Sequence, residues 1–511
     1  MNQQTYDVAI IGYGPVGALL ANLLARDGVQ TIVLERDREI YRLPRAVHFD
    51  HEIMRIFQSV GIASRLVDDT APLEGCEFLN ADHKLLFCFD LSQETTHQGW
   101  RQDYMFHQPG LEAVLRAALA ERDGVTVKLE HEVTELRELD DHVAIAVQDK
   151  VSGETSTVCS RYAVGCDGAN SFVRKRAGLK LDDLEFDEPW LVVDATIDRP
   201  RRELGLSGPM IQFCDPGRPV TFVPVCGPHI RWEFMLRPGE NKEDMLRPER
   251  VEQLIAKWVD PRHVQVIRTA VYDFHALVAS QWNTRRIFLA GDSAHQMPPF
   301  LGQGMCSGIR DAANLAWKLG LVLRGVAAES VLATYQLERD PHVRSIVEFA
   351  IATGRIICTQ DTAVAAARDA DFLSRPKTPQ EVASMPPLTN GLLQAGSKLA
   401  GQLGLQARVR TSDGMTGLLD DAVGPGFALL VNAGAVMLGR RAEEITRAIR
   451  AHLVPIDEEC DAAGTYRKWF ARHACDAVLV RPDHIIFGAA AGDDAPSKLL
   501  EELGARLNVS L

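Results

Sequence analysis

The chain has 511 residues, too many for one hydrophobic core, so we expect two or three domains. Hydrophobic residues make up 46% of the chain and its mean hydropathy is −0.08, which is typical of a globular enzyme or binding protein. The formal net charge of −14, with no basic cluster along the chain, argues against nucleic acid as a partner.

The sequence does not indicate a membrane protein or a metal-binding protein either. The N-terminus, MNQQTYDVAII, lacks the basic region and cleavage site of a signal peptide, and no apolar stretch is long enough to span a bilayer. The ten cysteines are scattered, without a C-x-x-C pair or a Cys/His cluster, so neither zinc nor a disulfide framework is indicated. The sequence therefore predicts a cytoplasmic protein without a metal centre.

The chain begins with a strand–helix–strand pattern. Residues 6–12, YDVAIIG, form a continuous β-branched run that predicts a strand buried on both faces. Residues 12–28 place leucines on one face of a helix that ends at a glycine, and residues 31–37, TIVLERD, predict a second strand. This is the βαβ unit of a dinucleotide-binding fold.

The turn between the first strand and the helix carries the fingerprint G-x-G-x-x-G. Gly12 permits the tight turn, Gly14 lets backbone N–H groups approach a pyrophosphate, and Gly17 lets helix and strand pack closely. The helix N-terminus then faces the phosphates, and Glu35 at the end of the second strand can accept hydrogen bonds from a ribose. The alternative, a glycine turn without a ligand, is disfavoured by this complete context.

A β-rich insertion follows. Residues 125–164 alternate like short antiparallel strands, and from 187 to 285 four further runs (WLVVDATI, MIQFCD, VTFVPVC and IRWEFML) predict one sheet with a solvated face. The segment IFLAGDSAHQMPPFLGQGM, residues 287–305, returns to an apolar strand, and a helix over 308–325 follows it. The dinucleotide fold is therefore predicted to resume near residue 286.

Four segments result from this division of the chain. Residues 1–186 and 286–406 are predicted to form the two parts of a Rossmann-like α/β domain, the second part with a helical connection. Residues 187–285 are predicted to form a β-sheet substrate domain, and residues 407–511 a small α/β tail that contains FALLVN, AVMLGRR and DAVLVRPDHIIFGAA.

Three motifs occur in order: GYGPVG, CDGANSFVR with Asp167, and AGDSAH followed by PP and GQG. Together they resemble the single-component flavin-dependent aromatic hydroxylases, which include 4-hydroxybenzoate and phenol hydroxylases. The runs PRA, CDP.RP, R.EFM..PGE and NLAWKL resemble most closely the 3-(3-hydroxyphenyl)propionate hydroxylase type. The similarity covers nearly the whole chain, and the tail resembles a thioredoxin-like C-terminal domain without C-x-x-C.

This resemblance implies the activity and the cofactors. Non-covalent FAD would occupy the single Rossmann fingerprint, and NADH or NADPH would reduce it transiently. O₂ would then hydroxylate a phenolic compound, a hydroxyphenyl-alkanoate or a related phenol of aromatic degradation, through a flavin C4a-hydroperoxide. Whether the protein forms a homodimer is left open.

The resemblance also assigns cofactor contacts. Asp292 would accept a hydrogen bond from the ribityl chain, and the helix that begins after Gly302 would face the flavin N1–C2=O edge with its amides. Arg45 would contact the phosphate–ribose region. The residues expected to bind the cofactor are Gly12, Gly14, Pro15, Val16, Gly17, Glu35, Arg36, Arg45, Gln108, Asp167, Asp292, Gly304 and Met305. For Arg36, Arg45 and Gln108 a surface ion pair or polar contact is the alternative.

The base that deprotonates the phenol remains open between several residues. His48, Asp50 and His51 lie together in RAVHFDHE. His295 lies in the segment 287–305, which we call the flavin loop, and a structural role is favoured for this histidine. The catalytic candidates are Asp50, His48 and Pro299, and the resemblance implies that the Pro299 carbonyl would contact the phenol. Candidate substrate residues are Val47, Phe213, Trp232 and Phe300, with Arg231 and Phe234 as further pocket-wall candidates.

Two rival functions stay open beside hydroxylation. One is an FAD oxidoreductase that does not oxygenate its aromatic substrate, and the other a non-catalytic flavoprotein. Cys460 and Cys475 are the only cysteines of the tail and lie 15 residues apart, which disfavours a redox role for that domain.

Overall fold

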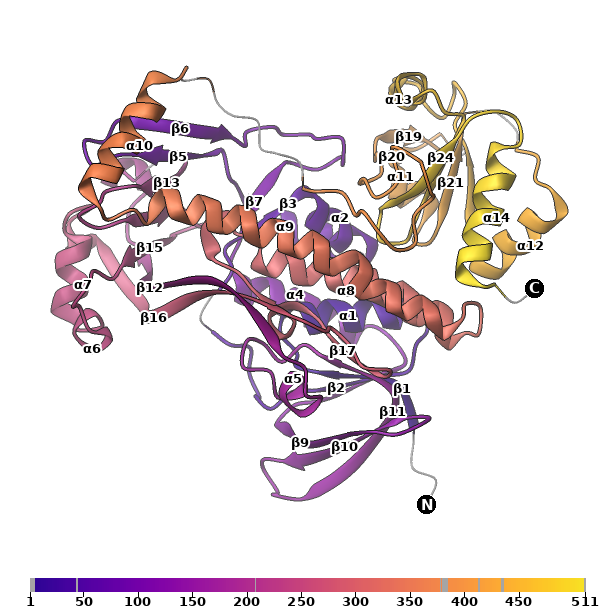
Figure 1. Cartoon of the computed structure of the whole chain (residues 1–511), viewed down its shortest axis with the longest axis horizontal. Helices are drawn as coiled ribbons and strands as arrows, with labels where there is room; N and C mark the ends of the chain where they lie inside the picture. Colours follow the sequence, from indigo (N-terminus) through magenta and orange to yellow (C-terminus); the bar gives the residue numbers. More distant parts are fainter. Residues whose placement is uncertain are drawn as a thin grey trace.

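The computed structural model describes residues 5–42, 45–206, 208–376, 378, 385–411, 414–432 and 436–509. Figure 1 shows two β-sheets connected by long strands, a layer of helices beside them, and a separate C-terminal part coloured yellow.

The first sheet is the dinucleotide-binding one, in the order β8-β2-β1-β11-β10-β9 with β17 beside β11. Strands β8, β2, β1, β11 and β17 pair in parallel, while β11, β10 and β9 pair antiparallel. The prediction of antiparallel strands over 125–164 is therefore right for three strands and wrong for β8, which extends the parallel part. Their bounds are β1 (Thr5–Ile11), β2 (Thr31–Leu34), β8 (Val125–Lys128), β9 (His131–Glu138), β10 (Val143–Asp149), β11 (Thr155–Gly165) and β17 (Ile287–Leu289).

Helices pack against this sheet. Helix α1 (Pro15–Arg26) buries its leucine face and is followed by Gly28 at φ +76°, as the sequence predicts. It packs against α4 (Gln108–Ala120) and the long α8 (Gly304–Leu323). Shorter helices are α2 (His51–Ser59), α3 (Ala63–Val67) and α5 (Phe172–Arg176).

The second sheet has eight strands in the order β18-β16-β12-β15-β14-β13-β5-β6. It takes in β5 and β6 from the first segment of the chain, which the sequence pattern had not placed there. The predicted limit at residue 186 falls inside β12, which is 17 residues long and pairs with β16 along most of its length. The bounds are β5 (Gly75–Leu79), β6 (Leu85–Asp90), β12 (Leu181–Ile197), β13 (Met210–Phe213), β14 (Val220–Val223), β15 (His229–Met235), β16 (Val264–Ala279) and β18 (His295–Gln296).

Small elements complete this region. A three-stranded sheet consists of β3 (His48–Asp50), β7 (Asp103–Met105) and β4 (Ala71–Pro72). Beside the large sheet lie α6 (Lys242–Met245) and α7 (Pro248–Ile255), and 3-10 turns occur at Arg201–Leu204, Pro261–His263, Gly291–Ser293, Pro299–Leu301 and Glu329–Ala333. Helix α9 (Thr334–Ile357) packs against α8, and α10 (Thr362–Ser374) lies against β6, at the end of the molecule away from the C-terminal part (Figure 1).

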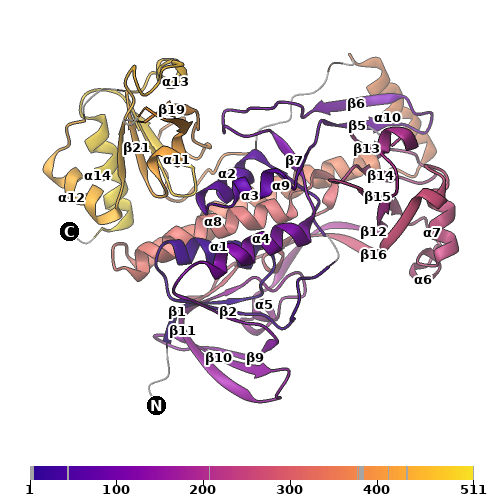
Figure 2. The same cartoon turned by 180° about the vertical axis from the view of Figure 1, so that it is seen from behind.

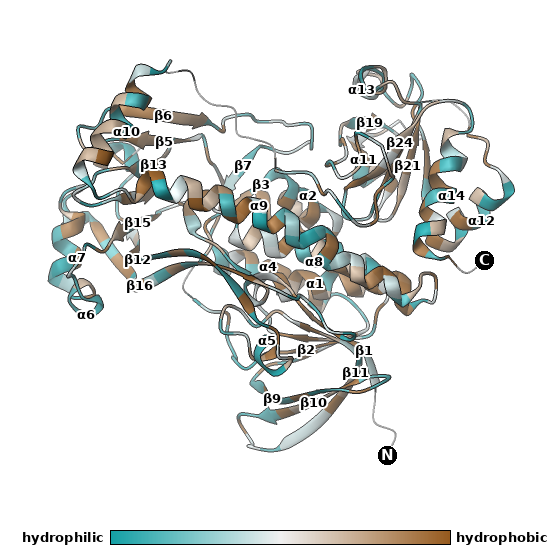
Figure 3. Ribbon diagram, viewed as in Figure 1, coloured by the Kyte–Doolittle hydropathy of each residue, from teal (hydrophilic) through white to brown (hydrophobic). Residues whose placement is uncertain are grey.

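The C-terminal part contains a four-stranded mixed sheet in the order β22-β21-β23-β24 with α12 and α14 packed together on it. Figure 2 shows it beside α2 and α8, and Figure 3 shows much teal on the peripheral helices α6 and α12. The described end of the predicted run AVMLGRR leads into α12, and its first residue, Ala435, lies outside the described residues. The bounds are β19 (Arg408–Arg410), β20 (Thr416–Leu418), α11 (Leu419–Val423), β21 (Ala428–Val431), α12 (Arg440–Ile449), β22 (His452–Pro455), α13 (Thr465–His473), β23 (Ala477–Val480), β24 (Ile486–Ala490) and α14 (Ala495–Leu507).

Two buried arginines connect the C-terminal part to the rest. Arg55 of α2 donates to both carboxylate oxygens of Asp420, at 2.7 and 2.9 Å. Arg481 donates to Glu338 of α9 at 2.8 Å, and both side chains are fully buried. Breaking a buried pair leaves an uncompensated charge, so these contacts fix the C-terminal part against α2 and α9.

Among the described residues, no helix is both long and apolar enough to cross a membrane, and no cluster of side chains could hold a metal ion.

Candidate active site

One cavity of about 1880 Å³ runs between the first sheet, the second sheet and the N-terminus of α8. It also reaches the C-terminal part.

The glycine turn has the geometry that its pattern predicts. Gly12 has φ +102°, and a Cβ there would lie 2.4 Å from the Cys166 carbonyl oxygen. A Cβ on Gly17 would lie 2.1 Å from the Gly12 carbonyl oxygen, so helix and strand can pack only without it. Gly14 meets nothing within 4 Å and faces the cavity just before Pro15 begins α1. The first N–H groups of α1 are thus open to a phosphate.

The adenosine end is formed by the end of β2. The Glu35 carboxylate accepts hydrogen bonds from the backbone N–H of Tyr13 at 2.7 Å and of Asp37 at 2.9 Å, and it lines the cavity. Arg36 also lines the cavity, but its side chain is 68% exposed and pairs loosely with Asp37. The Glu35 carboxylate is therefore held in place by two backbone N–H groups, whereas Arg36 lies at the rim.

The Gln108 side chain binds the backbone of the segment that contains Arg45. Its Oε1 accepts hydrogen bonds from the N–H groups of Arg45 and Ala46, each at 2.8 Å, and its Nε2 donates to Glu112 at 2.8 Å. Gln108 thereby orders the segment that carries Arg45 and Val47 along the cavity wall.

Asp167 lines the cavity, but its carboxylate is engaged in capping α5. It accepts hydrogen bonds from the Ser171 hydroxyl at 2.5 Å and from the Val173 N–H at 3.0 Å. The second motif therefore shapes the wall of the cavity through its backbone fold.

Asp292 lies where the apolar strand β17 ends. Its carboxylate lines the cavity without a hydrogen-bond partner among the described residues, and burial raises its pKa. A buried acceptor needs a partner, so Asp292 fits a hydroxyl group of a bound ligand. Val16 lines the same wall, and the missing side chain of Gly308 makes room for it, since a Cβ there would lie 2.6 Å from Val16.

The N-terminus of α8 is also open to the cavity. Gly304 and Met305 line it, and the helix has no side-chain cap, because Gln303 binds Asp50 and Arg310 instead. Uncapped N–H groups at the start of a 20-residue helix favour negative charge. Two helix N-termini, a glycine turn and an unpartnered aspartate thus fit the pyrophosphate, ribityl chain and flavin ring of FAD.

His48 occupies the centre of the cavity. Its Nε2 lies 2.5 Å from an oxygen of Asp103, because β3 and β7 pair side by side. Burial disfavours the charged imidazole, but the Asp103 hydrogen bond and charge outweigh it and raise the pKa of His48. The flavin loop touches this ring, since a Cβ on Gly302 (φ +64°) would lie 2.7 Å from His48 Nδ1.

Asp50, the other predicted base, is held in a different role. One oxygen caps α2 by accepting from the N–H groups of Glu52 and Ile53, and the other accepts from Arg310 at 2.6 Å. Although burial opposes it, the Arg310 charge holds the pKa of Asp50 below its usual range. We therefore correct the expectation that Asp50 is a proton acceptor, since it is a helix cap and an ion-pair partner.

Pro299 and Phe300 both line the cavity, as His48 does. The Phe300 ring packs edge-on against Trp190, with ring centroids 5.7 Å apart. Gly354 on α9 makes room for it, because a Cβ there would lie 2.6 Å from the Phe300 ring.

The large sheet presents alternate residues to the cavity. Met210, Gln212, Thr221, Val223, Arg231 and Glu233 line it. Phe213, Trp232 and Phe234 point to the opposite face, where Trp232 is fully buried. The expectation that Phe213 and Trp232 contact substrate is corrected by this alternation. Gln212 and Glu233, which also line the cavity, were not predicted from the sequence. Burial raises the pKa of Glu233 to about 7.

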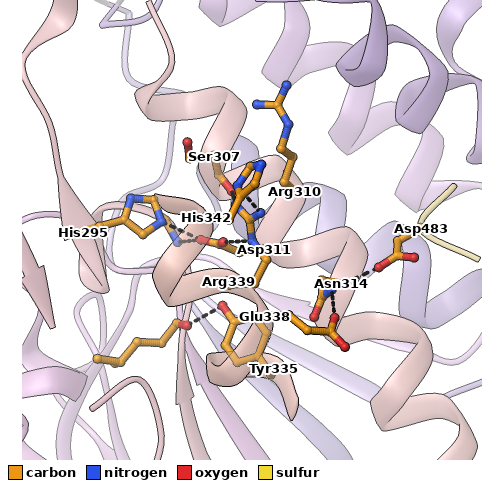
Figure 4. Close-up of polar contacts among 12 residues, drawn as sticks. His295, Ser307, Arg310, Asp311, Asn314, Tyr335, Glu338, Arg339, His342 and Asp483 are labelled. Carbon is orange, nitrogen blue, oxygen red and sulfur yellow. Dashed lines mark hydrogen bonds and ion pairs between the residues drawn. The ribbon is translucent and has the colours of Figure 1, made fainter. Parts of the chain in front are cut away.

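His295 has the structural role that was favoured for it. Its Nε2 lies 2.7 Å from Asp311, which also accepts from Arg339 at 2.8 Å, between α8 and α9 (Figure 4). Of the remaining candidates, His51 lines the cavity, while Cys460 and Cys475 are free thiols in the C-terminal part.

These residues define a flavoprotein whose cofactor site and catalytic side chains line one continuous cavity. The chain belongs to the family that carries the FAD binding domain, whose profile matches residues 5–350. The profile of the HcaD C-terminal domain matches residues 401–505.

Curated relatives cover almost the full chain. A protein of Rhodococcus jostii (strain RHA1) named "Probable NADH-specific resorcinol 4-hydroxylase" is 39% identical over 98% of this chain and 95% of its own length. A 3-(3-hydroxy-phenyl)propionate/3-hydroxycinnamic acid hydroxylase of Mycobacterium sp. (strain KMS) is 34% identical over 96% of this chain and 89% of its own length.

Solved structures show the same fold. Aklavinone-11 hydroxylase, in a complex with FAD and aklavinone, has a TM-score of 0.81 at 23% identity, covering 99% of this chain and 100% of that one. The p-nitrophenol 4-monooxygenase PnpA from Pseudomonas putida DLL-E4 has a TM-score of 0.66 at 23% identity over 72% of this chain and 93% of that one. The expected FAD-dependent aromatic monooxygenase is thus confirmed.

Proposed function

We propose that the substrate is a small uncharged phenol of the resorcinol type, with NADH as the reductant. The relative at 39% identity supports this choice. The observation that carries it is the charge balance at the centre of the cavity, where Arg231 is held by Asp194 at 2.7 Å and Arg310 by Asp50 and Glu52, each at 2.6 Å. A hydroxyphenyl-alkanoate would need a cation for its carboxylate.

The proton chemistry falls to His48. Phenolate is a far better carbon nucleophile than phenol, so the neutral imidazole accepts the phenol proton while Asp103 holds the ring and stabilises its charged form. Glu233 and Gln212 face the same space and supply polar contacts for a second hydroxyl group. Phe300 and Pro299 close the cavity and exclude water from the reacting ring.

Bound FAD supplies electrons from NADH to O₂, so that one oxygen atom enters the ring and the other leaves as water. Gly12, Gly14 and Asp292 hold the cofactor in this proposal, and the N-terminus of α8 favours the negative charge of its reduced form.

The test compares two aromatic compounds. Product formation, O₂ uptake and NADH oxidation are measured with resorcinol and with 3-(3-hydroxyphenyl)propionate at equal concentrations. We expect coupled hydroxylation of resorcinol and a lower kcat/KM for the carboxylate. Preference for the carboxylate would contradict the proposed substrate class, and NADH oxidation that never yields hydroxylated product would support the non-oxygenating alternative.

Three further expectations remain proposals. The ten free cysteines support a reducing, cytoplasmic location. The thioredoxin-like architecture of residues 407–511 is supported by their four-stranded mixed sheet with packed helices. A homodimer is to be tested by the mass of the protein in solution.

A further inference from the structure

The cavity extends past the residues assigned to FAD and to the phenol. Its volume of about 1880 Å³ includes those two sites and a further region. Beyond His48 and Arg310 it continues between α2, α8, α9 and the C-terminal part. We call this extension the interdomain chamber, and define it by His51, His97, His342, Leu388, Leu403 and Ile485.

The two walls of this chamber come from distant parts of the chain. Leu403 and Ile485 are joined by an isolated β-bridge and present apolar side chains from the C-terminal part. The opposite wall carries His51 and His97, whose rings lie edge to face with centroids 5.6 Å apart. His97 and Gln402 are exposed, so the chamber reaches solvent there.

The charged groups along the chamber are paired. Arg339 donates to Asp311 at 2.8 Å, and Asn314 connects Glu338 at 2.7 Å with Asp483 at 3.0 Å (Figure 4). Burial lowers the pKa of His342 and so disfavours its charged form. An apolar wall, a neutral His342 ring and balanced charges suit a flat uncharged aromatic molecule and not an ion.

We propose that the interdomain chamber is the passage through which small uncharged aromatic molecules reach and leave the catalytic cavity, with the C-terminal part as one of its walls. This gives that part a role that needs no redox chemistry. The proposal rests on the proposed function for the identity of the ligand. The proposal predicts that obstruction of the chamber lowers the association and dissociation rate constants of the aromatic ligand and leaves its Kd nearly unchanged.

The experiment introduces tryptophan side chains into the interdomain chamber of the flavin-loaded protein. Gln402→Trp adds a ring at the exposed mouth, where folding tolerates it, and Leu403→Trp adds one deeper. Leu453→Trp adds the same ring on β22, at a residue that is 40% exposed and outside the cavity, and serves as the matched control. Stopped-flow absorbance of the bound flavin reports resorcinol association and dissociation.

We expect both rate constants to fall together by about five-fold or more in Gln402→Trp and further in Leu403→Trp, with Kd within about two-fold of the wild type. The control should match the wild type. Unchanged rates in both chamber variants would overturn the proposal, and so would a weaker Kd caused by dissociation alone, since these residues would then belong to the binding site.

A failure of the proposed function is distinguishable from a failure of the passage. If resorcinol produces no signal in the wild type, the substrate assignment fails. Acrylamide quenching of the flavin fluorescence then tests the passage without any substrate. A quenching constant equal in wild type and both chamber variants would overturn the proposal, and a lower constant in the variants would support it.

Discussion

In the nucleotide half of the cavity, the groups that face the ligand are mostly backbone N–H groups at Gly14 and at the start of α8. In the catalytic half they are side chains that hold one another, as His48 and Asp103 do. Backbone donors are fixed by the fold and are hard to remove by mutation. Paired side chains depend on each partner, so single substitutions should have larger effects there.

The sharpest test of this difference is His48→Asn. Removal of the proton acceptor should lower the rate of hydroxylation by about two to four orders of magnitude, while FAD content stays at the wild-type level. Product formation per NADH consumed is the measurement, and His142→Asn, at the hairpin end away from the cavity, is the control. A variant that still couples NADH oxidation to product at the wild-type rate would remove His48 from the proposed chemistry.

Arg310→Met tests the mutual dependence of side chains. It leaves Asp50 and Glu52 buried without their partner, which should cost about 3–5 kcal/mol of stability. Urea or thermal denaturation measures the loss. Arg262→Met changes a side chain that is 86% exposed and should stay within about 0.5 kcal/mol of the wild type. Equal stability of the two variants would show that the catalytic half does not depend on this pair.

Asp292→Ala examines a side chain in the nucleotide half that has no hydrogen-bond partner among the residues that the structure describes. Loss of one buried acceptor should weaken FAD binding by about 1–3 kcal/mol, a smaller effect because the backbone donors remain. Fluorescence titration of the apoprotein with FAD gives the affinity. Asp141→Ala, with an 88% exposed side chain, is the reference, and an affinity equal to it would contradict the assignment of Asp292.

Asp103→Asn should shift the pH dependence of kcat/KM. A proton acceptor must be neutral, so kcat/KM rises with pH through the pKa of His48, which is raised above 6.5. Loss of the Asp103 charge lowers that pKa, and the rise should therefore shift to lower pH. Asp37→Asn, 62% exposed at the nucleotide end, should leave the profile in place. A shift to higher pH would reverse the assigned direction of this coupling.

The smallest effect is expected outside both halves. Burial raises the pKa of the Cys475 thiol to about 11 and also raises that of Cys460, so neither is a reactive thiolate near neutral pH. The double substitution to serine should leave turnover nearly unchanged in a coupled assay. A large loss, not reversed by added FAD, would restore a redox role to the C-terminal part.

The difference between the nucleotide half and the catalytic half of the cavity also explains which parts of the site could be predicted from the sequence. The functions of Gly12, Gly14 and Gly17 follow from their spacing between one strand and one helix, so a local pattern contains the whole turn. Asp103 is 55 residues from His48 and meets it only because two three-residue strands pair. No local signal indicates such a pairing.

The substrate sheet shows a subtler limit. Alternation along β15 puts Arg231 and Glu233 on one face of the sheet and Trp232 and Phe234 on the other, so these residues could not all line the cavity. It could not say which face lines the cavity, because that depends on the layer packed behind the sheet. The buried face is the more aromatic one here, which led Phe213 and Trp232 to be taken for substrate contacts.

Gly354 places a historical constraint on the catalytic cavity. Glycine inside a helix costs about 1 kcal/mol relative to alanine, yet any side chain at this position of α9 would collide with Phe300. The order of change is thus constrained. The Phe300 ring and the Phe186 ring, which would lie 2.9 Å from the same Cβ, must both make room before residue 354 can gain a side chain. A lineage that reduces both rings acquires the freedom to stabilise α9 afterwards, and the return to phenylalanine at either position is then blocked.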